Sequence, residues 1–373
     1  MRAAHVISFA VLLLVAPLSG CDKRSDSSPA PAPPAPAPSA PTATASEGPT
    51  PPPSARPFDP GQLAVFAPLP PTIERPDNPL TPEKVALGKM LWFDKRLSRG
   101  QDVSCNSCHD VTKAGAGDAA IPNGTKEQKG TRNAPTAFNA AAQGFQGWDS
   151  RATLFEELVV PHAGEPSVMG VDEKRLVDTV ASIPAYAAAF KKQFPDAKGM
   201  VTAETISLAL GAYARKLLTP GRWDKFLGGD QTALTDAEKA GLGAFMNASC
   251  TTCHAGRYVG AAQNQKLGIA KAWPNASDVG RFGVTKQEVD RFVFKVPSLR
   301  NVTRTGPWLH DGSIASLEEL TKLMSRHQVG KELTDAQAKS IVTFLGALSG
   351  DPAADLVAKP ELPASGPKTP KAD

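Results

Sequence analysis

The chain has 373 residues, and 41 Lys and Arg against 37 Asp and Glu give a formal net charge of only +4. The sequence has no basic cluster interleaved with aromatic residues, so nucleic acid is not an expected partner. One of the five cysteines lies near the N-terminus and the other four form two Cys-x-x-Cys pairs, so no disulfide framework is predicted.

Residues 1–20 predict a signal peptide. Arg2 precedes an apolar run from Val6 to Leu18 that is too short for a comfortable membrane span. The next residues complete "LSGC", which resembles a bacterial lipobox and implies cleavage before Cys21 and acylation of its thiol. We therefore expect a lipid anchor on a bacterial membrane, with the chain facing the periplasm. An ordinary signal peptide with a chance cysteine is the alternative.

Two segments have the composition of disordered chain. Residues 21–57 are built mainly from Pro, Ala, Ser and Thr, which cannot bury a core. Residues 351–373 have a similar composition and predict a disordered tail. The remaining length is enough for two domains of ordinary size, which we expect at 58–220 and 221–350.

The motif Cys-x-x-Cys-His occurs twice, as "CNSCH" at 105–109 and as "CTTCH" at 250–254. Two cysteines three residues apart on a helical turn can reach both vinyl groups of one porphyrin, and the next histidine then lies over the iron. A zinc ribbon would place its cysteine pairs close together, and a thioredoxin-like site would need a βαβ context. We therefore predict two covalent haem c groups, whose attachment and ligand residues are Cys105, Cys108, His109, Cys250, Cys253 and His254.

The sequence around the two motifs is also repeated. Before each motif, "LTPEKVALGKM" at 80–90 and "LTDAEKAGLGAFM" at 234–246 predict helices, the second with a capping box from Thr235 to Glu238. After each motif, matching residues recur at a constant separation of 162, such as Asn139 with Asn301. The chain therefore predicts two cytochrome-c-like domains, each with one covalent haem.

Apolar residues at three-and-four spacing predict further helices at 172–183, 202–218 and 335–348, the last after a capping box from Thr334 to Gln337. Strand signals are scarce. The expected fold class is mostly α.

With both motifs placed, the chain resembles the bacterial di-haem cytochrome c peroxidase and MauG family. The resemblance runs from about residue 78 to 350 and rests on the segments "NPLTPEKVALGKMLWFD", "SCNSCH", "KGTRNAPTAFN", "GWDSRATLFEEL", "GRFGVT", "FKVPSLRNVTRTGPWLHDGSIASLEEL" and "IVTFLGALSG".

The resemblance implies that the haem on His109 meets hydrogen peroxide. The haem on His254 would receive electrons from a small protein, a cytochrome c or a cupredoxin. Its second ligand would be Met324, whose thioether raises the reduction potential. His327, three residues further on, is the competitor for that role.

Other roles are implied by the same resemblance. Trp148 would relay electrons between the haems, with a large core side chain as the alternative reading. Asn133, Thr305 and Pro307 match the calcium site of the family. Arg132 and Arg300 are candidates to pair with haem propionates. The family is often dimeric, so a homodimer is also expected.

Two departures from the family affect the mechanism. Residues 110–131 contain no histidine that could cap the first haem. The position of the distal glutamate holds Val168, which cannot move a proton between peroxide oxygens, and the glutamine position holds Glu157 or Leu158. We hypothesise that His162, at the position of Met324 in the repeat, is either a sixth ligand or the replacing acid–base group. Glu165 is the second candidate, and a surface-loop histidine is the alternative reading of His162.

Three functions follow from this sequence. The leading prediction is a di-haem c-type peroxidase that reduces hydrogen peroxide to water. The second is a MauG-type oxidase that acts on a partner protein. The third is a non-catalytic electron-transfer cytochrome, which would fit a haem capped by both His109 and His162.

Overall fold

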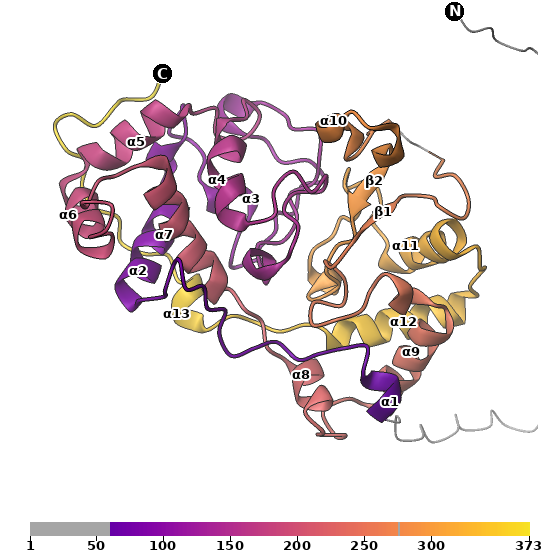
Figure 1. The fold of residues 1–373 in the computed structure, drawn as a ribbon. Coiled ribbons are helices and arrows are strands. Elements are labelled where there is room, and N and C mark those ends of the chain that lie inside the picture. The colour runs from indigo at the N-terminus through magenta and orange to yellow at the C-terminus, as the bar shows by residue number, and fades with distance from the viewer. Residues whose placement is uncertain (1–59, 275–276) are drawn as a thin grey trace, which may run out of the picture. The chain divides into compact units, whose positions relative to one another are not determined.

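The computed structural model describes residues 60–274 and 277–373. The expected signal peptide, Cys21 and the linker of residues 21–57 lie outside the described residues. The described part is mostly helical with one short antiparallel sheet, so the prediction of a mostly α fold is confirmed (Figure 1). Within these residues, no helix is both long and apolar enough to cross a membrane.

The elements follow one another along the chain as α1 (Pro60–Leu63), α2 (Pro82–Phe93), α3 (Cys105–Cys108), α4 (Phe155–Gly164), α5 (Glu173–Ser182), α6 (Pro184–Gln193), α7 (Ala203–Lys216), α8 (Arg222–Leu227), α9 (Asp236–Asn247), β1 (Asn264–Lys266), α10 (Phe282–Thr285), β2 (Val293–Lys295), α11 (Leu317–Met324), α12 (Asp335–Ala347) and α13 (Ala354–Val357).

The predicted helix starts are confirmed by their caps. The Thr81 side chain accepts a hydrogen bond from the backbone N–H of Lys84 at the start of α2. The capping box from Thr235 to Glu238 opens α9, and the box from Thr334 to Gln337 opens α12. Local sequence therefore fixes where these helices begin.

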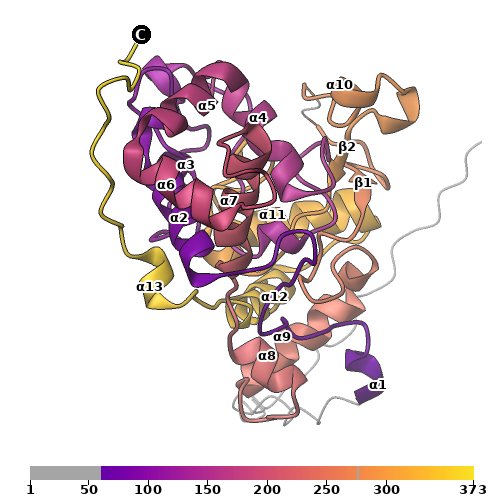
Figure 2. The same cartoon turned by 60° about the vertical axis from the view of Figure 1, so that its left-hand side comes forward.

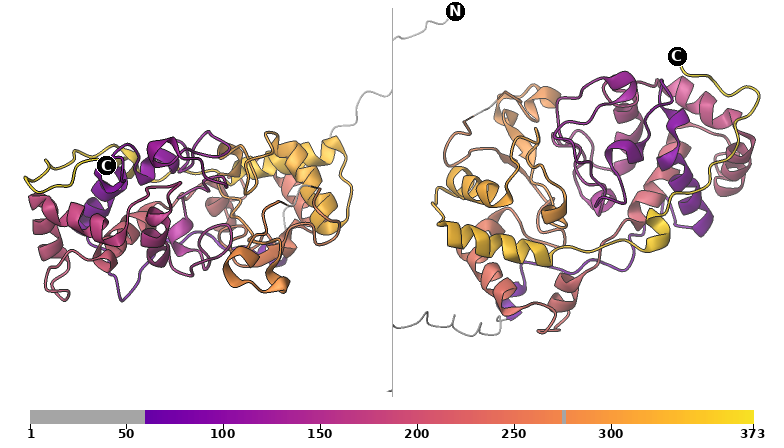
Figure 3. Two further views of the ribbon diagram at one scale, coloured as in Figure 1. Left: turned by 90° about the horizontal axis from the view of Figure 1, so that it is seen from above. Right: turned by 180° about the vertical axis from the view of Figure 1, so that it is seen from behind.

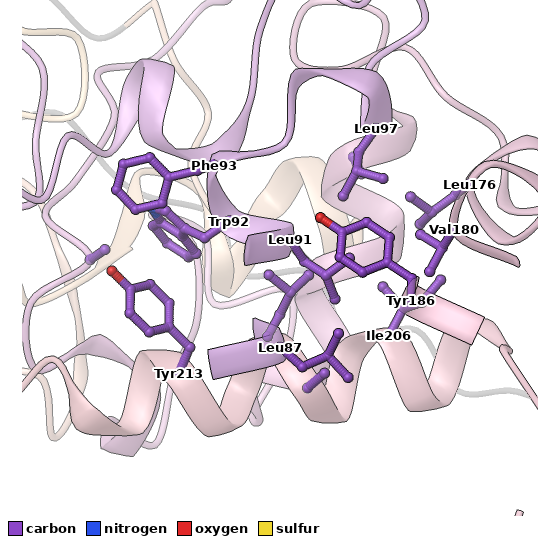
Figure 4. Packing of buried hydrophobic residues seen from close by; sticks show 14 of the residues in the cluster. Leu87, Leu91, Trp92, Phe93, Leu97, Leu176, Val180, Tyr186, Ile206 and Tyr213 are labelled. Atoms are coloured by element: carbon purple, nitrogen blue, oxygen red, sulfur yellow. The ribbon is translucent and has the colours of Figure 1, made fainter. Parts of the chain in front are cut away.

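The first hydrophobic core forms where α2 packs along α7 (Figure 4). Gly88 allows this approach, because a Cβ atom there would lie 1.9 Å from the Ala209 carbonyl oxygen and 2.9 Å from Tyr213 Cβ. Trp92 and Tyr213 then meet edge to face, with ring centroids 5.7 Å apart.

The second hydrophobic core repeats this arrangement with α9 and α12 (Figure 2). A Cβ atom on Gly241 would lie 2.1 Å from the Ser340 carbonyl oxygen and 2.9 Å from Phe344 Cβ. Phe245 and Phe344 take the places of the Trp92 and Tyr213 rings, 5.4 Å apart. The repeat seen in the sequence is therefore also a repeat of packing.

A buried hydrogen-bond network joins the two repeats. Asn139 and Asn301 both adopt the left-handed backbone conformation, with φ of 59° and 62°. Each side-chain amide donates to the Thr219 hydroxyl, at 2.8 and 2.9 Å. Because none of these three residues is more than 1% exposed, the network fixes the turns that follow the two Cys-x-x-Cys-His motifs in sequence.

The C-terminal segment differs from the expected disordered tail. After α12 the chain runs back to α13 beside the first core (Figure 3), where Leu356 is buried and its carbonyl accepts a hydrogen bond from the Tyr213 hydroxyl. At its end, Asp373 pairs with Arg99 and Arg175. Tertiary contacts therefore order a segment whose composition favours disorder.

Candidate functional site

A cavity of about 690 Å³ lies beside the first Cys-x-x-Cys-His motif. Cys105, Cys108 and His109 line it together with residues of α4, the loop after α4, and β2. Its volume is in the range of sites that enclose a small-molecule cofactor.

The motif itself forms the short helix α3. Ser104 caps it, and the His109 N–H donates to the Cys105 carbonyl, which brings the histidine to the same cavity as the two thiols. The His109 Nδ1 atom lies 2.8 Å from the Pro135 carbonyl oxygen, which leaves Nε2 free to bind a metal. Burial, aided by the charge of His162, lowers the pKa of His109 to about 4, so the ring is neutral near pH 7.

The second motif has the same local geometry. The His254 N–H donates to the Cys250 carbonyl, and Nδ1 lies 3.3 Å from the Val259 carbonyl oxygen. The carbonyls of Val259 and Pro297 both act against the effect of burial on the pKa of this ring. Burial lowers the pKa of His254 to about 4. Gly260 leaves room for the ring, since a Cβ atom there would lie 3.1 Å from its Nδ1.

These residues fit a haem. None of the four described cysteines is in a disulfide, so all four are available for thioether bonds to haem. Across the first cavity, the His109 and His162 ring centroids are 6.5 Å apart. A metal–imidazole bond is about 2 Å long, so this spacing has room for an iron atom between two ring nitrogens.

His162 lies in the last turn of α4 and lines the cavity opposite His109. Its Nδ1 atom is 3.6 Å from a carboxylate oxygen of Glu165, which also lines the cavity and pairs with Arg151. The interaction with His162 lowers the pKa of Glu165, and the Arg151 guanidinium lowers it further. The structure therefore brings together the two predicted proton-handling residues and adds Arg151, which the sequence analysis missed.

Glu157 lies away from this group. Its side chain is exposed and does not line the cavity, and its carboxylate accepts hydrogen bonds from the Thr153 and Leu154 N–H groups at 3.0 Å. The first-turn position that looked catalytic is thus used to cap α4. Leu158 and Val168, which stand where the family has a glutamine and a glutamate, do line the cavity.

Trp148 also lines the cavity, half-buried between the two repeats. Its indole N–H donates to the Asn133 carbonyl at 2.9 Å, and its ring centroid lies 6.4 Å from that of His310. Its own carbonyl accepts the N–H of Lys295 from β2 at 2.8 Å. Trp148 is therefore held by hydrogen bonds to Asn133 in the first repeat and to Lys295 in the second.

The two arginines expected at haem propionates are paired with aspartates. Arg132 lines the cavity and contacts Asp149 and Asp278, at 2.6 Å to each. Arg300 is 1% exposed and forms a bidentate pair with Asp224, at 2.8 and 2.9 Å. These pairs hold the guanidinium groups in place, and their role toward a propionate stays a prediction.

Met324 ends α11, as His162 lies at the end of α4. Its competitor His327 is buried, and His327 Nδ1 lies 3.0 Å from the carbonyls of Lys271 and Ala272. The Asn133 amide donates to the Ala120 carbonyl at 3.0 Å. Ligand roles for Met324 and for Asn133, Thr305 and Pro307 stay predictions.

Lys295 is the other residue that the sequence analysis missed. It comes from β2, is 7% exposed and lines the same cavity. The only signal in the sequence is a lysine inside the apolar run "VFKV" at 293–296.

Comparisons with known proteins agree with this geometry. Residues 82–232 match the family described as di-haem cytochrome c peroxidase. A cytochrome c551 peroxidase of Pseudomonas aeruginosa is 39% identical over 299 residues, which cover 79% of this chain and 86% of that protein. A methylamine utilization protein MauG of Methylorubrum extorquens is 31% identical over 308 residues, covering 77% and 83%. The solved structure of a MauG-like protein associated with microbial copper homeostasis is 26% identical with a TM-score of 0.66, covering 81% of this chain and 96% of that one.

Proposed function

This chain belongs to the di-haem cytochrome c peroxidase and MauG family, and we propose that it reduces hydrogen peroxide to water at the cavity beside His109. The observation that carries the proposal is the meeting of Cys105, Cys108, His109, His162 and Glu165 around that one cavity. Each turnover takes two electrons and two protons per peroxide and yields two waters.

A haem attached covalently at Cys105 and Cys108, with His109 as a ligand of its iron, would supply the redox chemistry. The residues of the chain supply the protons. The pKa of Glu165 is lowered, and its carboxylate lies 3.6 Å from Nδ1 of His162, so its negative charge would favour a proton at Nδ1 and leave Nε2 as the base. After its ring has moved away from the iron that the 6.5 Å ring spacing lets it contact, His162 would take a proton from one peroxide oxygen at Nε2 and return it to the leaving oxygen.

Cys250 and Cys253 would hold a second haem, with His254 and Met324 as ligands of its iron. This haem would receive electrons from a small redox protein such as a cytochrome c or a cupredoxin, and Trp148 would relay them to the first haem. The two haems divide the chain into domains at 58–220 and 221–350. Calcium at Asn133, Thr305 and Pro307 would stabilise the loops between them.

The cellular setting is also part of the proposal. Cleavage before Cys21 and its acylation would anchor the protein to a membrane, with residues 21–57 as a spacer in the periplasm. A homodimer is the expected assembly.

A MauG-type oxidase is the second candidate. The 31% identity to a MauG protein and the likeness to a MauG-like structure favour it. In that case electrons would come from a side chain of a partner protein. Sustained peroxide turnover with a reduced cytochrome or cupredoxin as the only electron source separates the two, because the oxidase has no such donor.

Replacing His162 tests the proposed function. In His162→Ala, kcat/KM for hydrogen peroxide should fall by about 10²–10⁴-fold, because the acid–base group is lost. Glu157→Gln is the matched control and should leave turnover unchanged, because glutamine also caps a helix at this position. Unchanged turnover and haem spectra in His162→Ala would refute the proposed role, and a wild-type chain that ignores peroxide would be an electron-transfer cytochrome.

A further inference from the structure

Lys295 is a buried cation that reaches the first cavity from the second half of the chain. It lies on β2, which pairs with β1 so that Lys295 stands opposite Asn264. Only 7% of it is exposed, and it lines the cavity that also holds Cys105, Cys108 and His109. A lysine so deeply buried needs a partner for its charge.

The partners of Lys295 within the described residues are few. Its Nζ atom donates to the Gln143 side-chain oxygen at 2.9 Å, which uses one of three ammonium protons. No carboxylate of the described residues lies within 4 Å of Nζ. Burial lowers the pKa of Lys295 to about 8, and no acidic group raises it.

The acidic residues that line the cavity are already paired. Asp149 accepts hydrogen bonds from Arg132 and Arg151, and Glu165 pairs with Arg151. Lys295 therefore keeps two free ammonium protons in the cavity where the haem would be held.

We propose that Lys295 binds a propionate carboxylate of the haem attached at Cys105 and Cys108. The inference rests on the proposed function, because it needs that haem in this cavity. Haem carries two propionates, and a carboxylate can take the free ammonium protons and balance the buried charge. Lys295 also donates its backbone N–H to the Trp148 carbonyl, so one residue contacts both the haem edge and the proposed electron relay.

The pairing has a consequence for the reduction potential. A propionate anion stabilises the ferric haem, which has the higher positive charge, and a paired ammonium cancels that effect. Removing the cation should therefore favour the ferric form and lower the midpoint potential of this haem. The reduction potential of the His254 haem should not change, because Lys295 lines the cavity of the first motif.

Redox titration of the full-length di-haem protein tests the inference. In Lys295→Met, the His109 haem should shift about tenfold toward the ferric form, which is about 59 mV for one electron. Its propionate vibrations in resonance Raman spectra should shift as well. Lys295→Arg keeps a cation and should keep the wild-type potential. Lys266→Met removes the same charge from the exposed end of β1 and should change neither haem.

The His109 haem is identified as the one whose EPR signal changes in His162→Ala. Equal potentials and equal Raman spectra in wild type and Lys295→Met, with both haems attached, would overturn the inference. Mass spectrometry of the wild-type chain that shows no haem on Cys105 and Cys108 would instead overturn the proposed function. The two failures are therefore distinct.

Discussion

The surroundings of His109 and of His254 share one structural frame, by which we mean the backbone carbonyl at the histidine ring, the helix pair that meets at a glycine, and the asparagine that bonds Thr219. In each, a backbone carbonyl lies within hydrogen-bond distance of the ring Nδ1, that of Pro135 at 2.8 Å in the first case and that of Val259 at 3.3 Å in the second. In each, two helices pack closely at a glycine, Gly88 or Gly241. In each, an asparagine after the motif donates a hydrogen bond to the Thr219 hydroxyl.

The residues that face the two sites differ. His162 faces His109, whereas Met324 occupies the equivalent position in the second repeat. Asp149 is buried and paired with two arginines, whereas Asp311 is half-exposed and accepts the Ser313 N–H. The repeat therefore keeps the residues that build the frame and changes those that set the chemistry.

The largest expected effect comes from making the second site resemble the first. In Met324→His, the potential of the His254 haem should fall by a few hundred mV, within the range of about 0.8 V that axial ligands span. The physical reason is that a thioether favours ferrous iron more than imidazole does. Spectroelectrochemical titration of both haems measures the change.

His327→Ala is the companion variant for this test. If Met324 is the ligand, His327→Ala should leave the potential of the His254 haem close to the wild-type value. If Met324→His has no effect and His327→Ala causes the fall, His327 is the ligand and the equivalence of positions 162 and 324 is wrong.

A second test compares the two equivalent aspartates. Asp149→Asn should lower the free energy of unfolding by about 2–4 kcal/mol, because the buried carboxylate loses its charge-assisted hydrogen bonds from Arg132 and Arg151, although each arginine keeps a second carboxylate partner. Asp311→Asn should change it by no more than about 0.5 kcal/mol, as is usual for a substitution of this kind near the surface. Urea unfolding at pH 7 measures both.

The difference between wild type and Asp149→Asn should depend on pH. Although burial opposes it, hydrogen bonds from Arg151 and Arg132 lower the pKa of Asp149. The stabilisation is therefore complete above the unfolded pKa of about 3.9 and is lost as the pH falls through the lower folded value. A difference that persists unchanged at pH 2 would contradict the ionic origin of the effect.

Much of the frame could be predicted from the sequence because it depends on local patterns. The capping boxes at Thr235 and Thr334 marked two helix starts, and the spacing of 162 residues placed His162 opposite His109. These signals work because helix caps and internal repeats act over short or fixed distances along the chain.

Predictions from the sequence were wrong or missing where a residue can serve more than one role, or where its partner is distant along the chain. Glu157 was a proton-transfer candidate, but a glutamate in the first turn of a helix serves equally well as a cap. The tail was expected to be disordered, yet its Leu356 accepts a hydrogen bond from Tyr213, a residue about 140 positions earlier in the chain. The sequence did not indicate that Lys295 lines a cavity, because only the tertiary fold brings a residue of β2 to the cavity that α3 also lines.

The smallest expected effect concerns the frame itself. Gly88→Ala and Gly241→Ala should each lower the free energy of unfolding by about 1–3 kcal/mol, because a Cβ atom would lie 1.9 or 2.1 Å from a backbone carbonyl oxygen and the helices would have to separate. Gly346→Ala in α12 is the control, since no atom lies within 4 Å of its Cβ position and alanine favours a helix. Hydrogen exchange should show faster exchange in α2 and α7 for the first variant and in α9 and α12 for the second. If one variant sped up exchange in both pairs of helices, the two repeats would unfold as one cooperative unit, and their stabilities would not be independent.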